Sequence, residues 1–356
     1  MSFSYGNKIR VSIFGQSHSE KIGVVIDALP AGFSPDLTEL AAYCRRRTSR
    51  GLSYTTERRE EDAFEIVSGL ADGVTCGAPL CALISNTDIC PADYDKFRTV
   101  PRPSHADYPA EEKYHGFQDV RGGGAFSGRM TAPLVFAGGL LTQLYRQKGI
   151  VLGTRVKSIG STEDALLLPA DLTPETLGEI DKKDLPCFGD PAPLIREIEN
   201  AKAHGDSVGG VIECFVLGLP VGTGETAFDS LESRISACVF AVPGVKGIAF
   251  GDGFALAAMH GSEANDPYGF DKTGAVRTAS NHNGGILGGL ATGMPVCFTA
   301  AMKPTPSIAA EQKTVDLSTG KGTALTVSGR HDPCIVPRAA VCIESAAAIA
   351  LADLLL

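Results

Sequence analysis

The chain has 356 residues and a net charge of −9, with 44% hydrophobic and 21% charged residues. That length can bury a large core, in one large domain or two, and the composition is ordinary for a soluble enzyme. The acidic balance argues against a general nucleic-acid-binding protein. No apolar run of about 18 residues, the length that a membrane span needs, is present. Ten scattered cysteines without metal-ligand spacing, and an N-terminus without an apolar signal core, indicate buried thiols in a reducing cytoplasm.

The first part of the chain combines strand and helix patterns. Residues 8–14 alternate apolar and polar side chains as a half-buried strand does, and 23–29 form a second strand pattern closed by a proline and a glycine. The serine, proline and acid at 34–36 then predict the start of a helix, with the serine as its cap, that ends in the arginine run 45–47. A strongly apolar helix pattern follows at 130–144.

A similar order returns in the second half, as a helix at 193–203, a strand over 205–213, a helix at 228–240 and an apolar run at 245–250. In both halves a Gly-polar-Ser turn precedes a Val-Ile-acid strand and then Leu-Pro-x-Gly. We therefore predict an internal duplication of strand–helix units that pack into one α/β sandwich, of the α+β type. Residues 1–356 then form one domain with pseudo-repeated halves at roughly 1–150 and 190–356.

The remaining segments complete this prediction. Residues 295–302 are expected to form a strand and 338–356 a mostly buried helix, because they are apolar nearly throughout. Residues 161–191 lack a clear period and are predicted to be a surface excursion. Residues 262–283 are long and polar, and segments of that kind are commonly functional lids.

A glycine-rich stretch at 121–129 precedes the apolar helix. Backbone N–H groups at a helix start favour an anion, and glycine lets a ligand approach them closely. Arg121 and Arg129 flank the turn, so it is a candidate phosphate site, although such a loop can also be a simple turn. The spacing Gly122-x-Gly124-x-x-x-Gly128 has one residue too many for a dinucleotide-binding motif, and no buried strand pattern precedes it.

Arginines and histidines supply the other candidate site residues. Six arginines lie within fifteen residues of this acidic chain, either as helix-end solvation or as an anion site: Arg45, Arg46, Arg47, Arg50, Arg58 and Arg59. We favour the anion site, because arginine forks match phosphate and carboxylate oxygens. His18 and His105 lie in polar turns and can be structural, but each titrates near neutral pH and can transfer a proton.

Two later loops are also candidates. The glycine-rich segment 283–293 leads into a strand and then Lys303 to Ser307, which can seat a flat ligand or form a tight sheet crossing. The charged loop Arg330-His-Asp332 is followed by Arg338 at the start of the last helix. Asp332 can orient Arg330, and Arg338 can reach an anion.

Together these pieces resemble the chorismate synthase family over essentially the whole chain. Seven blocks carry the resemblance, in order: 15–23, the arginine run with 54–60, 105–108, 121–124, 281–289, 303–307 and 330–334. The resemblance implies a carbon–oxygen lyase of the shikimate pathway of aromatic amino-acid biosynthesis. Such an enzyme eliminates phosphate from 5-enolpyruvylshikimate 3-phosphate in a 1,4 sense to give chorismate. The family requires reduced FMN and forms a homotetramer with an α/β sandwich fold.

The resemblance also implies roles for individual residues. FMN is expected to contact Ala125, Phe126, Ser127, Pro243, Gly244, Gly288, Lys303, Pro304, Thr305, Pro306, Ser307 and Arg330. The nicotinamide reductant NADPH would contact Arg46 and Arg50, and the substrate would contact Arg46, Arg129 and Arg338. His18 resembles the proton donor to the leaving phosphate, and His105 the group that protonates reduced flavin. Ser17 and Asp332 resemble their proton-relay partners, and no metal is implied.

This chain departs from the family pattern at Ala125-Phe126, where many relatives carry Arg-Ser, so one cation near the cofactor is absent. The arginine run is also spaced differently before Tyr54. The absence of a reductase-like segment favours an external flavin reductase as partner. Two other functions remain open: an ordinary flavin or nicotinamide reductase, and a non-catalytic binder of a phosphorylated metabolite.

Overall fold

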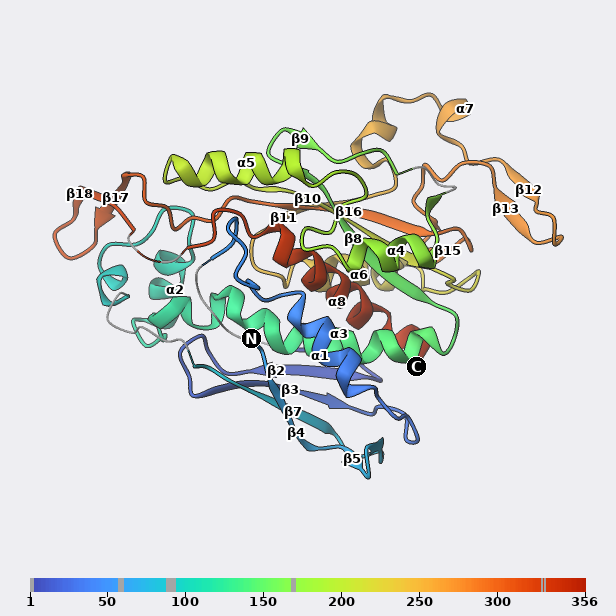
Figure 1. Ribbon diagram of the computed structural model, residues 1–356, viewed down its shortest axis with the longest axis horizontal. Helices are drawn as coiled ribbons and strands as arrows, with labels where there is room; N and C mark the ends of the chain where they lie inside the picture. Colours follow the sequence, from blue (N-terminus) through green and yellow to red (C-terminus); the bar gives the residue numbers. More distant parts are fainter. Residues whose placement is uncertain (1–2, 57–60, 88–93, 168–170, 328, 330) are drawn as a thin grey trace.

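Two five-stranded antiparallel sheets enclose a layer of helices in the computed structural model (Figure 1). The structure describes residues 3–56, 61–87, 94–167, 171–327, 329 and 331–356. In the view of Figure 1 one sheet lies below α1, α3 and α8, and the other lies above them. This layered arrangement of mixed helices and strands confirms the predicted α/β sandwich. No helix in the described ranges has both the length and the apolar character to cross a membrane.

The first sheet has the strand order β1-β2-β3-β7-β4. Its strands are β1 (Ser4–Tyr5), β2 (Arg10–Phe14), β3 (Lys21–Asp27), β7 (Leu80–Ser85) and β4 (Phe64–Ser68). Helices α1 (Leu37–Arg45) and α3 (Thr131–Arg146) belong to this half. Asp36 caps α1 by accepting from the backbone N–H groups of Thr38 and Glu39 at 2.9 Å each, so the prediction that Ser34 is the cap was wrong.

The second sheet repeats this topology. Its order is β11-β16-β10-β8-β9, from strands β11 (Val245–Phe250), β16 (Val296–Met302), β10 (Gly210–Leu217), β8 (Val151–Ile159) and β9 (Thr162–Glu163). The run β2-β3-α1-β4-β7-α3 corresponds to β8-β10-α6-β11-β16-α8, with α6 at Leu231–Val239 and α8 at Val336–Leu355. The two runs share one order of elements, and the second run starts at β8 (Val151–Ile159), while the duplication itself stays a prediction.

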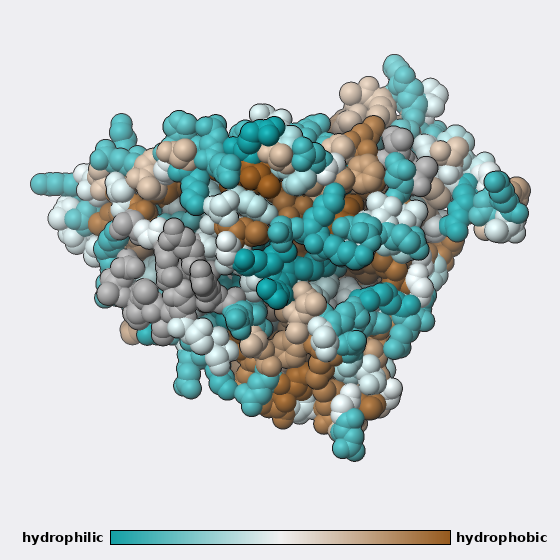
Figure 2. Space-filling view, viewed as in Figure 1, coloured by the Kyte–Doolittle hydropathy of each residue, from teal (hydrophilic) through white to brown (hydrophobic). Residues whose placement is uncertain are grey.

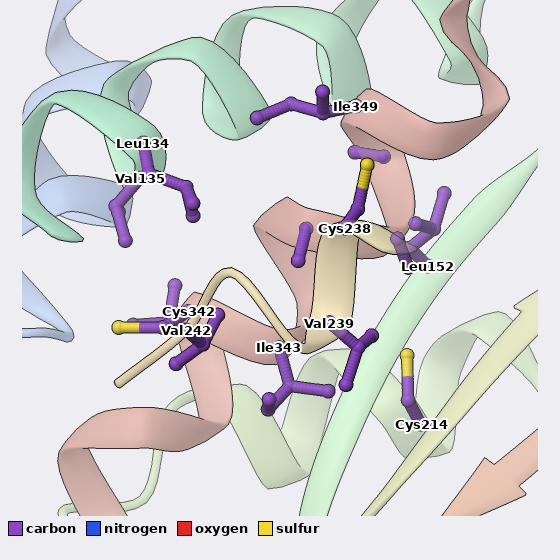
Figure 3. Packing of buried hydrophobic residues seen from close by; sticks show 14 of the residues in the cluster. Leu134, Val135, Leu152, Cys214, Cys238, Val239, Val242, Cys342, Ile343 and Ile349 are labelled. Atoms are coloured by element: carbon purple, nitrogen blue, oxygen red, sulfur yellow. The ribbon is translucent and has the colours of Figure 1, made fainter. Parts of the chain in front are cut away.

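Helices α3, α6 and α8 fill the space between the sheets. Gly138 of α3 meets Ser345 of α8, where an added Cβ would lie 2.3 Å from the serine Cβ, so the helices cross closely. The Tyr145 hydroxyl donates to the Ala348 carbonyl at 2.7 Å and so satisfies its buried oxygen. Figure 3 shows Cys238 and Cys342 packed as small apolar side chains in this core. All nine cysteines in the described ranges are free thiols.

Two segments outside the sheets and central helices differ from their sequence-based predictions. Segment 161–191 contains α4 (Pro174–Asp181) and buries Leu177, Ile180, Leu185 and Cys187, so it is a packed part of the domain. Residues 261–278 form α7 (Gly261–Ala264) and the hairpin β12 (Tyr268–Phe270) and β13 (Val276–Thr278), which extends outward beyond β15 in Figure 1. The other elements are α2 (Asp107–Tyr114), α5 (Ala192–Ala203), β5 (Leu70–Ala71), β6 (Val74–Thr75), β14 (Ile286–Leu287), β15 (Leu290–Ala291), β17 (Gln312–Asp316) and β18 (Lys321–Leu325).

Candidate active site

A cavity of about 700 Å³ lies where loops from both halves of the chain meet. Its wall is formed by residues from 47–56, 94–106, 122–131, 240–246, 303–307 and 331–342. A cavity of this size can enclose a metabolite or cofactor of several hundred daltons. Five of the seven sequence blocks therefore contribute to one wall, and the blocks at 15–23 and 281–289 do not.

The cavity wall is strongly basic although the whole chain is acidic. Among the described residues its wall carries six cationic side chains and one carboxylate: Arg47, Arg102, Arg129, Lys246, Lys303 and Arg338, with Asp332. Clustered cations inside a low-dielectric recess concentrate a positive field and attract anions. The arrangement suits a ligand that carries several negative charges.

The glycine stretch forms a tight loop, η3 (Arg121–Phe126), against the turn that carries Ser17 and His18. Gly122, Gly123 and Gly124 have φ values of 62°, 83° and 55°. A Cβ at Gly122 would lie 2.1 Å from Nδ1 of His18, so only glycine allows this approach. The Ser17 N–H donates to the Gly124 carbonyl at 3.1 Å. Ser17 and His18 therefore lie directly behind the cavity wall.

The two arginines that flank the glycine stretch have different positions. Arg121 is half exposed and pairs with Asp119 at 2.8 Å, and it does not line the cavity. Arg129 is buried in the wall, after the short turn η4 (Gly128–Met130). The prediction that both arginines face one anion was therefore wrong for Arg121, whose guanidinium already binds the neighbouring carboxylate.

His18 is nearly inaccessible, with 4% of its surface exposed. Its ring packs edge-on against Tyr94, with 5.3 Å between the ring centroids, and Tyr94 lines the cavity. Gly122 approaches the Nδ1 and Cε1 atoms of the ring so closely that a Cβ there would clash with both. These contacts hold the imidazole in one orientation at the edge of the cavity.

His105 is held by Asp107 at 2.5 Å from its Nδ1 atom. The Nη2 atom of Arg102 contacts the same Nδ1 atom at 3.0 Å, so both neighbours hold this ring nitrogen, while Nε2 lies beside Gly123. Arg102 binds the same carboxylate through Nε at 2.7 Å and Nη2 at 2.8 Å. Burial lowers the pKa of His105, and the Arg102 charge also lowers it, although the hydrogen bond to Asp107 acts in the opposite direction.

Three other arginines of the wall are paired with carboxylates, Arg47 and Arg129 with Asp62 behind the wall and Arg338 with Asp332 in it. Arg47 donates to Asp62 through Nε at 2.6 Å and Nη2 at 2.8 Å, and Arg129 binds the same carboxylate through Nη1. Arg338 binds Asp332 through Nη1 and donates from Nε to the Arg47 carbonyl at 2.8 Å. The guanidinium groups are therefore fixed before any ligand arrives.

Arg46 and Arg50 do not line the cavity. Arg46 is next to Arg47 at the end of α1, but its side chain points elsewhere, and its Nη2 atom binds Asp181 at 2.6 Å and Glu344 at 2.8 Å. Arg50 binds Asp184 at 2.9 Å. The predicted substrate and NADPH contacts of Arg46 would require these ion pairs to break.

One wall of the cavity brings together most of the residues expected to hold FMN. Ala125, Phe126 and Ser127 face it, with Pro243, Gly244 and Lys303 to Ser307. The Lys303 N–H donates to the Gly244 carbonyl at 2.9 Å, which joins two of these segments. The Thr305 hydroxyl oxygen is buried and has no hydrogen-bond partner among the residues that the structure describes, as expected of a group whose partner is a ligand. This wall fits a phosphate-bearing cofactor.

The remaining predicted residues lie elsewhere. Gly288 connects β14 to β15 and is absent from the cavity wall. Arg330 lies outside the described residues, as do Arg58 and Arg59. Segment 262–283 contributes no described residue to the wall, because its hairpin projects away from the body of the molecule (Figure 1). Its assignment as a lid over the cofactor therefore has no support from the cavity geometry.

Sequence reasoning missed four residues that line or support the cavity. Arg102 and Asp107 share the proline-bounded turn of His105, so their spacing around that histidine was the available signal. Lys246 interrupts an apolar strand pattern and gave no separate signal. Asp62 follows the arginine run, and only its contacts with Arg47 and Arg129 identify it.

The chain is similar to known proteins over nearly its whole length. The sequence profile of the family described as Chorismate synthase matches residues 9–356. A chorismate synthase of Dehalococcoides mccartyi (strain BAV1) is 42% identical over 358 residues, covering 100% of this chain and 97% of its own length. A chorismate synthase of Thermococcus kodakarensis is 41% identical over 352 residues, covering 99% and 97%.

A solved structure described as a crystal structure of chorismate synthase has the same fold. It superposes with a TM-score of 0.74 at 26% identity and covers 98% of this chain and 91% of the other. The match therefore includes both sheets and the helices between them. With the profile match over residues 9–356 and relatives above 40% identity, the chain belongs to the chorismate synthase family.

Proposed function

We propose that this protein converts 5-enolpyruvylshikimate 3-phosphate to chorismate and phosphate, as a carbon–oxygen lyase of the shikimate pathway that requires reduced FMN. The observation that carries the proposal is the cavity wall with six cations, with His105 in that wall and His18 directly behind it. The substrate has two carboxylates and a phosphate. A chain with a net charge of −9 can bind it only where cations are concentrated.

The arginines would bind and orient this substrate. Arg129 and Arg338 are the two predicted substrate ligands in the wall, and the structure adds Arg47 and Arg102. Each charge-assisted hydrogen bond contributes about 1.5–3 kcal/mol, so several such contacts can offset the desolvation of a multiply charged anion. Charge that develops on the departing phosphate would be stabilised by the same fixed guanidinium groups.

The two histidines would manage the protons. His18 would hand a proton to the leaving phosphate from its fixed position behind Gly122, with Ser17 beside it. His105 would exchange a proton at Nε2, because Asp107 holds the other ring nitrogen. Asp332 lines the cavity and would serve as the second relay partner, while it also binds Arg338.

Lys303, Thr305 and Ser307 would hold FMN, with the Pro243-Gly244 turn and the backbone of 125–127. Bound reduced FMN would supply electron density to the breaking C–O bond and would be reduced again at the end of the reaction, with no net oxidation. Phe126 would offer an aromatic face where relatives carry serine, and its ring lies 6.4 Å from that of Tyr114. Burial lowers the pKa of Lys303, and the positive charge of the neighbouring Lys246 lowers it further.

The proposal also covers the oligomeric state, the compartment and the source of reduced flavin. We propose a homotetramer in the cytoplasm that takes reduced flavin from an external reductase. NADPH would reach Arg46 and Arg50 only by displacing the carboxylates that both guanidinium groups already bind outside the cavity.

An anaerobic assay tests the proposed reaction. The protein is given dithionite-reduced FMN and 5-enolpyruvylshikimate 3-phosphate, and phosphate, chorismate and the flavin spectrum are followed together. We expect one phosphate per chorismate and a flavin that is still reduced at the end. Stoichiometric flavin oxidation would indicate the reductase instead, and substrate binding without phosphate release would indicate the non-catalytic binder.

A further inference from the structure

Asp62 lies between two of the arginines that line the cavity. It accepts from Arg47 at 2.6 and 2.8 Å and also from Arg129, and the three side chains are only 2–5% exposed. We propose that Asp62 is a positioning residue that holds Arg47 and Arg129 side by side as one clamp for a substrate anion. The inference rests on the proposed function, because it takes the anion to belong to the substrate of that reaction.

The carboxylate is needed because two guanidinium groups cannot lie together in a buried site without an anion. Like charges at hydrogen-bond range repel strongly where water is excluded. The shared carboxylate places a negative charge between the two guanidinium groups and so offsets their repulsion. Burial acts to raise the pKa of Asp62, but the two guanidinium groups hold it below its ordinary value, so the residue stays ionised at neutral pH.

The clamp is connected to the rest of the site. The Arg338 Nε atom donates to the Arg47 carbonyl at 2.8 Å, so Arg338 is seated on the same segment. Arg129 donates from Nε to Asn86 at 2.8 Å, and the Asn86 amide donates to the carbonyls of Ser19 and Gln16 at 2.7 and 3.2 Å. Asp62 therefore stands behind three cavity arginines and, through Asn86, behind the turn that carries His18.

The backbone at Asp62 makes asparagine the best test substitution. Its φ of 52° lies in the left-handed region, which aspartate and asparagine tolerate better than most residues. Asp62→Asn therefore keeps the turn and the side-chain shape and removes the negative charge. A change in binding then reports the carboxylate and not the local backbone.

Asp164 provides a matched control. Its side chain is 1% exposed, and it accepts from Arg155 at 3.2 Å and from the Phe188 N–H at 2.7 Å, but it does not line the cavity. Asp164→Asn thus breaks a buried ion pair of similar burial elsewhere in the fold. Both variants are expected to lower Tm, whereas only the change at Asp62 is expected to alter the anion site.

The experiment compares steady-state kinetics and calorimetric substrate binding for both variants. For Asp62→Asn we expect KM and the substrate Kd to rise about 10- to 100-fold, the equivalent of one lost charge-assisted contact, with a smaller change in kcat. The affinity for oxidised FMN, followed by flavin fluorescence, should stay within about twofold. Asp164→Asn should keep the wild-type KM.

The result that overturns the inference is an unchanged or lower KM in Asp62→Asn, or an equal rise in Asp164→Asn. If Asp62→Asn does not fold, Asp62→Glu replaces it: the longer arm displaces both guanidinium groups, and a wild-type KM there would refute positioning. If the wild-type protein releases no phosphate from the substrate, the proposed function fails separately. Calorimetry with inorganic phosphate then still tests the clamp, because Asp62→Asn must weaken that binding.

Discussion

His105 and His18 are the residues whose chemistry can be separated most clearly from their structural roles. Asp107 and Arg102 hold Nδ1 of His105, and Gly122 and Tyr94 pack against the ring of His18. Each ring is therefore held in place by groups other than the ligand. A substitution that removes the ring should reduce turnover more than it changes the fold.

We predict that His18→Ala and His105→Ala each reduce kcat about 10²- to 10⁴-fold, the usual contribution of a general acid or base. His204→Ala is the control, since His204 is exposed, lies outside the cavity wall, and its Nδ1 atom lies 2.8 Å from the carbonyl oxygen of Asn200. Circular dichroism should show the same fold in all three. A wild-type rate in either of the first two variants would remove that histidine from the mechanism.

Part of the site could be predicted at the residue scale and part could not. The Lys303 to Ser307 segment, Ser127, Arg129 and Arg338 were placed in one site from sequence blocks, and the cavity brings them together. The carboxylates behind the arginines could not be predicted, because Asp62 and Asp107 act through contacts that depend on tertiary packing. The direction of a side chain was also not predictable, as adjacent Arg46 and Arg47 face different partners.

At the scale of elements, helix α4 is attached to the core through a shared arginine. Asp181, at the end of α4, and Glu344 of α8 both bind Arg46. Burial and then the neighbouring Glu344 carboxylate raise the pKa of Asp181 to about 7, against the opposing charge of Arg46. One guanidinium cannot fully compensate two buried carboxylates.

This arrangement predicts a pH-dependent stability. The unfolded pKa of an aspartate is about 3.9, so between that value and about pH 7 the folded state binds more protons and stability falls as the pH rises. In Asp181→Asn the side chain at position 181 cannot titrate, so this fall in stability with rising pH should be absent. Urea unfolding at pH 5 and pH 8 should show the variant gaining stability relative to wild type at the higher pH. A constant difference between the two proteins would contradict the assignment.

The elements themselves were largely predictable because their patterns are strong. The apolar run 245–250 is the observed strand β11, and the helix expected at 193–203 is observed as α5, Ala192–Ala203. The strand β8 was missed, because it is buried on much of its length and lacks alternation. Helix α4 was missed because it is short and its apolar residues are few.

At the scale of the whole molecule, the surface indicates association. Figure 2 shows apolar side chains gathered over the lower sheet, where a groove of about 340 Å³ is lined by Leu37, Phe64, Ile66, Val67, Ser68 and Leu70. Exposed apolar patches of this kind commonly mark contacts between proteins. The expected homotetramer would cover surface that a monomer leaves in water.

We predict a solution mass of about four times the 37.2 kDa chain, measured by light scattering at micromolar concentration. The mass should stay the same with and without FMN, since the cavity is built within one chain. A monomeric mass across this range would contradict the tetramer without affecting the proposed chemistry.

The central claim is that one cavity, built from both duplicated halves, holds the flavin and the phosphorylated substrate together. A crystal structure of the protein with FMN and 5-enolpyruvylshikimate 3-phosphate tests this directly. The account predicts the flavin against Lys303 to Ser307 and the substrate's anionic groups against Arg47, Arg129 and Arg338. Flavin or substrate bound at separate sites, or a substrate whose anionic groups contact none of these arginines, would contradict it.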